Sequence, residues 1–406
     1  MDIDGGAEHD AVRRQRFPLG SAITIERLAK DPYPLFRDLR AREPVTWAPA
    51  LSMWLLTRRD DIVAVLADPD LFTTDSAAST IRDVFGRQML SSDGPDWIRY
   101  KRACMKPFRK EALVGDMRSL IREWVAELVA GFDRRDVADL RSELSVPLSL
   151  GAVLRVMGLP AGDSRQIHEW YDDFAEALAN FTGDAAVRRR GHDSARAFAD
   201  YVTPYIEGAR RVPPRSLLGH LLREDSRTLT DAEVVSNLLI VLFGGVETAD
   251  SMISTCLYAL LTHPEVRSEA RETPARLPVI VDEILRWDAP VQSCTRFATR
   301  ATEIGGVAIG EGETVQCMLG AANRDPDRFR DPQRLDTARE NSDEHLSFGA
   351  GRHFCLGAVM ARMETEAALR AVLEAFPSAT LVDPEEARPT GHEFRRPGKL
   401  RVRLRA

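Results

Sequence analysis

Apolar residues recur at helical intervals over most of the chain between about residues 95 and 290. In the segments 120–130 and 217–222, for example, they fall three or four positions apart, which places them on one face of a helix. Prolines within 211–215 and 272–278 interrupt the pattern and mark candidate helix ends. The pattern predicts a mainly helical protein.

Shorter stretches with strand-like patterns flank this region. They predict strands near 45–47, 53–56, 307–316 and 399–404. Residues 1–16 lack apolar periodicity, and we expect them to form a disordered tail. The predicted fold class is therefore mainly α with a smaller β part.

The longest predicted helix begins with a capping box, in which Thr230 is the N-cap and Glu233 reaches back to it. The helical pattern then runs to His263, where Pro264 stops it. A helix this long and this apolar should cross the protein interior.

Two glycines, Gly244 and Gly245, lie in the middle of this helix, where each costs about 1 kcal/mol relative to alanine. Either a flat ligand lies against the bare backbone or another helix packs closely there. The next residues include Glu247 and Thr248, which are costly among apolar neighbours unless they have partners.

Composition narrows the class of protein. The 406 residues are 44% hydrophobic and 29% charged, as in soluble globular proteins, and the net charge of −7 argues against a general nucleic-acid binder. The five cysteines show no paired spacing, which disfavours a disulfide framework or a zinc site and suits a reducing cytoplasm. The acidic N-terminus and the absence of an uninterrupted membrane-length apolar run predict a cytoplasmic protein without a membrane segment.

Candidate chemistry concentrates in the segment 345–357, where Cys355 follows a glycine-rich loop and precedes a helix-like run. Gly349 and its neighbours allow a tight turn, and the helix start favours a thiolate over a thiol. A thiolate shielded by Phe348 would suit an axial ligand of haem iron. The alternative is a buried free cysteine beside a flexible loop.

The full pattern Phe-Gly-x-Gly-x-His-x-Cys-x-Gly over 348–357 resembles the cysteine-ligand loop of the cytochrome P-450 haem-thiolate monooxygenases, soluble bacterial type. Further matches, in the right order, are Glu-Thr at 247–248, Glu-x-x-Arg at 283–286 and Asn-Arg-Asp-Pro at 323–326. The resemblance implies one large domain over 17–406. It also implies haem b between the long central helix and the cysteine loop, with Cys355 as the iron ligand.

The resemblance implies further roles. Thr248 would hydrogen-bond dioxygen and Glu247 would relay protons. The residues expected to contact the haem are Gly244, Gly245, Phe348, Gly349 and, at its propionates, Arg296, His353, Trp97 and Lys101. The bacterial pattern usually has His at position 97 and Arg at 101, and this sequence departs from it at both positions. Glu283, Arg286 and Arg339 would form a structural network that fixes the segment leading to the cysteine loop.

Substrate and partners follow by analogy. The expected pocket residues are Ile240, Phe243, Val291, Gln292, Ser293, Cys294, Phe85, Met89 and Phe394. They suit a medium-sized organic metabolite, which the enzyme would hydroxylate or otherwise oxidise. No flavin, nicotinamide or iron–sulfur pattern is present, so electrons should come from a ferredoxin or flavodoxin with its reductase. A basic cluster could steer this acidic partner to a monomeric enzyme; its members are Arg99, Lys101, Arg102, Lys106, Arg109 and Lys110, with Arg352 and Arg362.

Two other functions stay open. One is a haem-thiolate enzyme of another type, such as a peroxide-driven oxidase or an oxidative coupling enzyme, against which the Glu247–Thr248 pair argues. The other is a non-enzymatic haem sensor or ligand carrier.

Overall fold

The computed structural model of the chain describes residues 11–180, 183–211, 216–222 and 229–405. The expected tail lies partly outside this range, at residues 1–10. Residues 11–16, however, are helical, and the guanidinium of Arg13 binds Glu313 and lies 4.5 Å from the ring centre of Trp47. Ordered structure therefore begins before residue 17. The apolar pattern did not indicate this, because residues 11–16 are anchored by the contact of a cation with an aromatic ring.

Contacts between Cα atoms divide the chain into two compact units. Of the described residues, the first unit comprises those within 1–73, 255–355 and 383–398, and the second comprises those within 74–254, 356–382 and 399–406. One boundary falls inside helix α14 (Asp231–Thr262), so at this point the chain passes between units within a continuous element rather than a linker.

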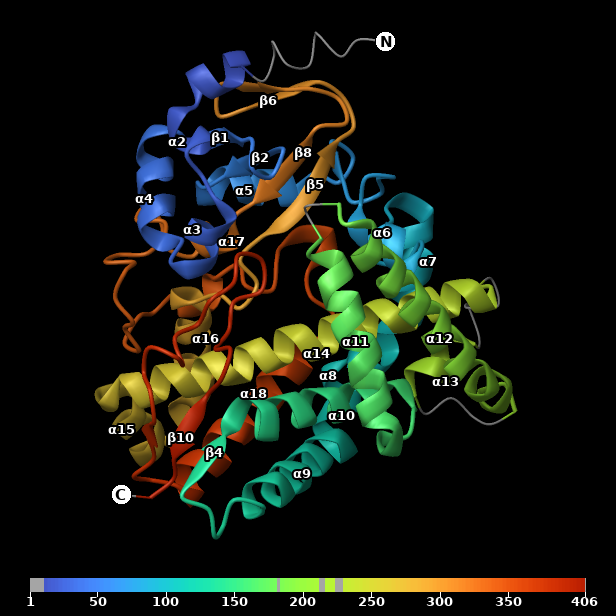
Figure 1. Cartoon of the computed structure of the whole chain (residues 1–406), viewed down its shortest axis with the longest axis vertical. Helices are drawn as coiled ribbons and strands as arrows, with labels where there is room; N and C mark the ends of the chain where they lie inside the picture. The colour runs from blue at the N-terminus through green and yellow to red at the C-terminus, as the bar shows by residue number, and fades with distance from the viewer. Residues whose placement is uncertain (1–10, 181–182, 212–215, 223–228, 406) are drawn as a thin grey trace. The chain divides into compact units, whose positions relative to one another are not determined.

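A five-stranded sheet forms the centre of the first unit, with the order β1-β2-β8-β5-β3 (Figure 1). Strands β2 and β8 are parallel, and the other neighbouring pairs are antiparallel. The strands are β1 (Val45–Ala48), β2 (Met53–Leu56), β3 (Phe72–Thr73), β5 (Cys294–Ala298) and β8 (Thr314–Cys317). A separate two-stranded ribbon pairs β6 (Thr302–Ile304) with β7 (Val307–Ile309). The predicted strands at 45–47, 53–56 and 307–316 are thus confirmed.

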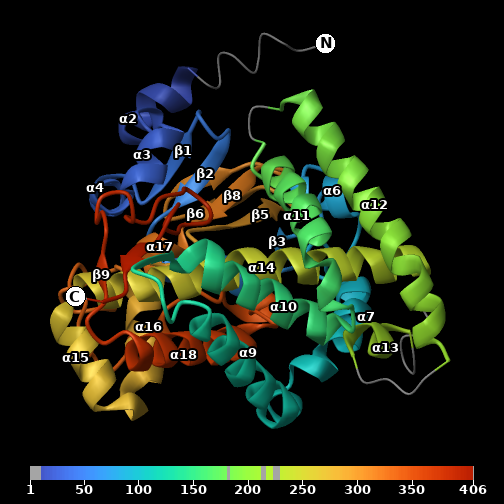
Figure 2. The same cartoon turned by 60° about the horizontal axis from the view of Figure 1, so that its bottom comes forward.

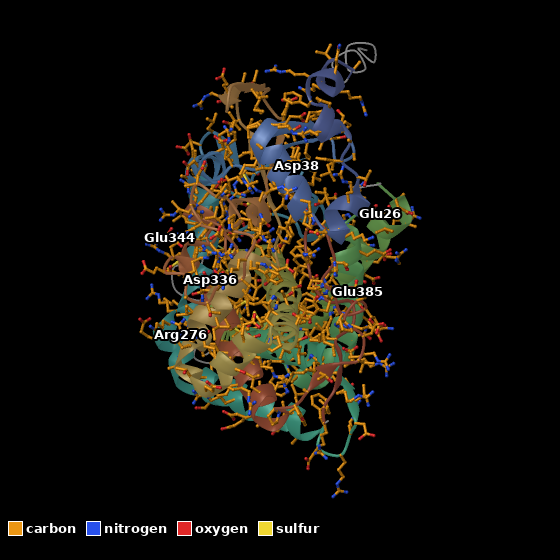
Figure 3. The ribbon with its side chains drawn as sticks, turned by 90° about the vertical axis from the view of Figure 1, so that its left-hand side faces the viewer. Glu26, Asp38, Arg276, Asp336, Glu344 and Glu385 are labelled. Atoms are coloured by element: carbon orange, nitrogen blue, oxygen red, sulfur yellow. The ribbon has the colours of Figure 1, made fainter. Side chains whose placement is uncertain are left out.

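The first unit also contains short helices. They are α2 (Pro18–Ser21), α3 (Ile25–Lys30), α4 (Tyr33–Arg42), α5 (Arg59–Ala67), α15 (Pro264–Glu272), α16 (Leu277–Trp287) and α17 (Leu319–Ala322), with 3-10 turns Pro274–Arg276, Ser342–Glu344 and Gly351–His353. Helix α15 ends and α16 begins within the proline-containing break predicted at 272–278. Arg276 at this break donates to the carbonyl of Thr337 at 2.6 Å, close to Asp336, and Figure 3 shows the two labelled residues near each other.

The second unit is mainly helical (Figure 2). Its helices besides α14 are α6 (Thr80–Phe85), α7 (Gly94–Met105), α8 (Lys110–Ala112), α9 (Arg118–Ala130), α10 (Val146–Met157), α11 (Ser164–Leu178), α12 (Ala185–Ala209), α13 (Leu217–Leu221) and α18 (Ala358–Ala375). It also has 3-10 turns Lys106–Phe108 and Ala161–Asp163, and π-helical turns Leu113–Met117 and Arg141–Ser145. Helices α11 and α12 lie side by side in both views. A three-stranded antiparallel sheet has the order β4-β10-β9, with β4 (Val137–Asp139), β10 (Arg401–Arg403) and β9 (Thr380–Leu381).

Helix α14 begins with the predicted capping box. The backbone N–H of Thr230 donates to Glu233 Oε2 at 2.8 Å, and that of Glu233 donates to Thr230 Oγ1 at 3.3 Å. By length and composition α14 is also the one helix in the described ranges that could cross a bilayer. The apolar pattern had not indicated this, because glycines and Glu247 interrupt the apolar run. In its most apolar window, however, 61% of the residues are buried inside the protein, as in the core helix of a soluble protein.

The carboxylate of Glu233 also joins α14 to α7. Arg99 donates to its two oxygens at 3.1 and 2.6 Å, and the phenol of Tyr100 donates at 2.8 Å. These charge-assisted bonds, with Arg99 the largest contributor, lower the pKa of Glu233 to about 2. Arg99, expected in the partner-steering basic cluster, is therefore engaged within its own unit.

Candidate functional site

The loop before Cys355 owes its shape to glycines with positive φ. Gly349 has φ 69° and Gly351 has φ 67°, a region that other residues rarely adopt. A Cβ atom at Gly351 would lie only 2.3 Å from the carbonyl oxygen of Leu66, so only glycine allows this approach to helix α5. The N–H of Cys355 donates to the carbonyl of Phe348 at 2.9 Å. The loop thus fixes the backbone of a partly exposed cysteine.

Aromatic rings accompany this loop. The ring of Phe348 lies 5.6 Å from that of His345 and 6.4 Å from that of Phe354, and Phe348 and His353 are both partly exposed. In the described ranges no group of three or more His, Cys, Asp or Glu side chains is arranged to hold a metal ion. A single thiolate, by contrast, is enough as the protein ligand of haem iron.

Asn323 holds the segment that leads into the loop. Its side-chain oxygen accepts from the N–H of Leu346 at 2.6 Å, and its amide donates to Ser347 Oγ at 2.9 Å. The Ser347 hydroxyl in turn donates to the carbonyl of Leu285 at 2.8 Å. Sequence reasoning noted the Asn323 motif but assigned it no contact, because no local pattern shows which backbone a buried amide will reach.

The structure brings Glu283, Arg286 and Arg339 together. Arg286 donates to the two oxygens of Glu283 at 2.7 and 2.8 Å, and Arg339 Nε lies 3.2 Å from Glu283 Oε2. Glu283 and Arg286 are fully buried. The remaining donors of Arg286 reach the carbonyls of Asn323, Pro332 and Arg334 at 2.8–3.1 Å. All five guanidinium hydrogens therefore have nearby acceptors, which a buried arginine requires.

The two glycines of α14 have different surroundings. A Cβ atom at Gly245 would meet Val153 of α10 at 2.5 Å, so close helix packing accounts for this glycine. At Gly244 nothing lies within 4 Å of the same position. Thr248, one turn later, donates to the carbonyl of Gly244 at 2.6 Å, and both residues are partly exposed. The open helix surface therefore consists of Gly244 and Thr248, and the helix stays continuous there.

Glu247 points to a different set of neighbours. The residue is buried, 4% exposed, and its carboxylate accepts a hydrogen bond from the phenol of Tyr171 on α11. The Tyr171 ring stacks on those of His168 and Phe243, at 5.8 and 6.1 Å between centres. Sequence reasoning did not find Tyr171, because its pairing with α14 is tertiary and the helical pattern of α11 shows it only as a core position.

The four candidates for propionate contacts divide between the units. Trp97 and Lys101 are partly exposed on α7, four residues apart and hence on one face. Arg296 on β5 is 6% exposed, and its Nη1 donates to the carbonyl of Thr295 at 2.8 Å. His353 lies in the cysteine loop of the same unit as Arg296.

Pocket candidates of the second unit form part of an aromatic cluster. The ring of Phe85 lies 6.0 Å from that of Phe243 and 5.4 Å from that of Phe174. Ile240 is buried on the same helix as Phe243, and Met89 is partly exposed, with its N–H bound to Asn237 at 3.2 Å. The two phenylalanine rings thus pack together, and the place of these residues in the substrate pocket stays a prediction.

In the first unit the candidates gather where the segment after α16 meets the turn at 391–396. Val291 forms an isolated antiparallel bridge with Phe394, and both are partly exposed, as is Cys294. Ser293 is almost buried. Gln292 is the exception: its side chain is fully buried and donates to the carbonyl of Ala289 at 2.6 Å.

Gln292 also donates to Tyr33 at 3.1 Å, and a Cβ atom at Gly320 would lie 2.2 Å from its side-chain oxygen. It therefore packs between core elements, and its expected place in the pocket is wrong.

Comparisons with known proteins agree on one family. The family model described as cytochrome P-450 matches residues 177–274 and 275–399. The 6-deoxyerythronolide B hydroxylase of Saccharopolyspora erythraea is 32% identical over 371 residues, covering 86% of this chain and 90% of that protein. The cytochrome P-450 monooxygenase PikC of Streptomyces venezuelae is 34% identical over 374 residues, covering 88% and 87%. The crystal structure of P450BioI in complex with a hexadec-9Z-enoic acid-ligated acyl carrier protein has a TM-score of 0.86 at 30% identity, covering 94% of this chain and all of that one.

Proposed function

The chain belongs to the cytochrome P-450 family, whose cofactor is haem b, and we propose that its own residues serve this family's monooxygenase chemistry as follows. Cys355 would hold the haem iron through its thiolate. The observation that carries this proposal is a partly exposed cysteine whose backbone is fixed by a loop with two positive-φ glycines. When bound, haem supplies the iron at which dioxygen is activated.

In this proposal helix α14 supplies the residues that act on dioxygen. The bare surface at Gly244 suits a flat ligand, and the hydroxyl of Thr248 lies on the same face, where it can accept or pass a proton. Glu247 holds a proton at its carboxylate and receives or returns it through Tyr171. Gly245 serves packing instead.

Arg296, His353, Trp97 and Lys101 provide donors for the two haem propionates. Arg296 and Lys101 bring charge, and Trp97 offers one indole N–H. Phe348 and Gly349 border the thiolate. The buried group of Glu283, Arg286 and Arg339 keeps the chain before the cysteine loop in place through Asn323 and Ser347.

The substrate is a medium-sized organic metabolite that is hydroxylated or otherwise oxidised. Apolar and aromatic residues such as Phe85 and Phe243, with few polar groups, support this class. Two of the most similar relatives, by name, are a hydroxylase of 6-deoxyerythronolide B and a monooxygenase. The whole protein is a cytoplasmic monomer in this proposal.

Electrons come from a ferredoxin or flavodoxin with its reductase. The basic residues of α7 and the following turn, without Arg99, together with Arg352 and Arg362, attract this acidic partner. No nucleic acid takes part, in keeping with the net charge of −7.

The reduced carbon-monoxide spectrum tests the proposal. Haem-loaded wild-type protein should show the red-shifted band of a thiolate ligand, and Cys355→Ala should lose it. Cys256→Ala, which removes a fully buried thiol on α14, is the matched control and should keep the band. A Cys355→Ala protein with an unchanged band would overturn the assignment.

A further inference from the structure

A polar cluster lies where strands β5 and β8 meet the turn at 391–396, and Gln316 is at its centre. The Gln316 side-chain oxygen accepts from the Thr295 hydroxyl at 2.6 Å. Its amide donates to Ser293 Oγ at 2.6 Å and to Glu393 Oε1 at 3.1 Å. All three bonds agree on one orientation of the amide, so Gln316 anchors one oxygen of the Glu393 carboxylate.

The backbone holds Glu393 on both sides. Gly391 has φ 124°, and a Cβ atom there would lie 1.9 Å from the carbonyl oxygen of Phe394, so only glycine closes this turn. The N–H of Gln292 donates to the carbonyl of Glu393 at 2.8 Å, and the N–H of Arg395 donates to that of Pro290 at 2.7 Å. Glu393 is thus presented by a fixed turn rather than by a mobile loop.

The carboxylate of Glu393 has no cationic partner within the described ranges. Nearby Arg395 is committed to Asp288 at 2.9 Å, and Arg296 donates to the carbonyl of Thr295. Burial, opposed by the bond from Gln316, raises the pKa of Glu393 to about 7. Enclosing a carboxylate without a cation is costly, and a ligand that brings a positive charge would offset the cost.

The surroundings suit a ligand. Glu393 remains partly exposed, and so do its neighbours Val291, Cys294 and Phe394. A mainly apolar wall with one convergent acidic group is the usual composition of a site that orients an organic molecule by a single polar end. Gln316 is fully committed to Thr295, Ser293 and Glu393, and the acid without a cationic partner favours a cation.

We infer that Glu393 is a specificity-determining residue, and that the substrate class is an organic molecule with a basic nitrogen, bound through its ammonium group. This inference rests on the proposed monooxygenase function. The ammonium would form the ion pair that Glu393 lacks and would leave the apolar remainder against Val291 and Phe394.

A pair of probes of equal shape tests it. The first is 4-phenylbutyl-trimethylammonium, which has no lone pair with which to ligate iron, and the second is its neutral isostere with carbon in place of nitrogen. Binding of each to the holoenzyme is measured by equilibrium dialysis and by the spin-state change. The wild-type protein should prefer the ammonium by about tenfold or more, as one pKa unit of interaction implies.

Glu393→Gln keeps the acceptor for Gln316 and removes the charge, so the preference should fall to near unity, while Glu393→Asp should retain part of it. The matched control is Glu385→Gln on the same segment, an exposed acid paired with Arg388 at 3.1 Å and labelled in Figure 3; its preference should be unchanged.

A wild-type protein that shows the thiolate band but binds the isostere as tightly as the ammonium, or binds neither, overturns the inference without any variant. A Glu393→Gln protein that retains the band and the full preference also overturns it. Loss of the thiolate band in the wild type would instead contradict the proposed function itself.

Discussion

The phenol of Tyr171 on α11 donates a hydrogen bond to the carboxylate of Glu247 on α14. Both residues are buried, and rings of His168 and Phe243 enclose the phenol on its two sides. The acid proposed to relay protons is therefore held by a group that itself carries a transferable proton. Tyr171 therefore acts as a positioning residue for Glu247.

Tyr171→Phe should keep the ring packing and remove the hydrogen bond from the phenol to the Glu247 carboxylate. We expect the product formed per dioxygen consumed to fall about three- to tenfold, with a changed pH profile of turnover, because Glu247 no longer has one fixed orientation. Tyr201→Phe, which removes a phenol bound to Asp163 at 2.9 Å, is the control and should change neither quantity. An unaltered pH profile and unaltered coupling in Tyr171→Phe would show that the bond is only structural.

Thr248→Ala should uncouple oxygen consumption from substrate oxidation. With electrons supplied by a ferredoxin system, product yield should fall at least about tenfold and hydrogen peroxide should be released, because general acid–base contributions are commonly this large or larger. Thr248→Ser retains the hydroxyl and should restore most of the yield. If the wild-type enzyme instead turns over fully with peroxide and Thr248→Ala has no effect, the peroxide-driven alternative would hold.

Arg286→Lys should lower both stability and haem content. Lysine keeps the charge but cannot supply the fork to Glu283 or the bonds to three carbonyls. We expect a loss of about 3–5 kcal/mol in the free energy of unfolding, as for other broken buried pairs. Arg388→Lys, in an exposed pair with Glu385, should cost less than about 1 kcal/mol. Comparable effects in the two variants, measured by denaturant unfolding, would contradict the role of the network.

Glu364 on α18 predicts a pH-dependent stability. Burial raises its pKa well above the ordinary value, and its Oε2 has no partner in the described ranges. A raised folded-state pKa gives stability that is present below the unfolded pKa and is lost as pH rises. Glu364→Gln should therefore gain stability relative to the wild type between pH 5 and 8, by at most about 1.4 kcal/mol per pH unit. Denaturant unfolding at pH 5, 6.5 and 8 measures the difference, and a constant difference would show that Glu364 ionises normally.

Local patterns predicted what depends on neighbours in sequence. The capping box of Thr230 and Glu233 and the i,i+3 pair of Glu283 and Arg286 lie where expected, because their geometry is set within one helix. Contacts between elements could not be predicted in this way. The hydrogen bond between Tyr171 and Glu247, for example, depends on how α11 packs against α14.

The sequence also did not indicate which side chains of some segments face the core. Gln292 is a core residue, because it packs against Tyr33 and Gly320, which are distant in sequence and which no local pattern indicates. Gly244 and Gly245 looked equivalent until the position of Val153 separated an open surface from a packing contact.

The carboxylate of Glu233 couples the movement of α7 to that of α14. It caps the first turn of α14 and, with the same two oxygens, holds Arg99 and Tyr100 of α7. The Glu233 carboxylate thus connects α7 to the first turn of α14. An outward movement of α7 must therefore either carry the start of α14 with it or break the three hydrogen bonds that Arg99 and Tyr100 donate to Glu233.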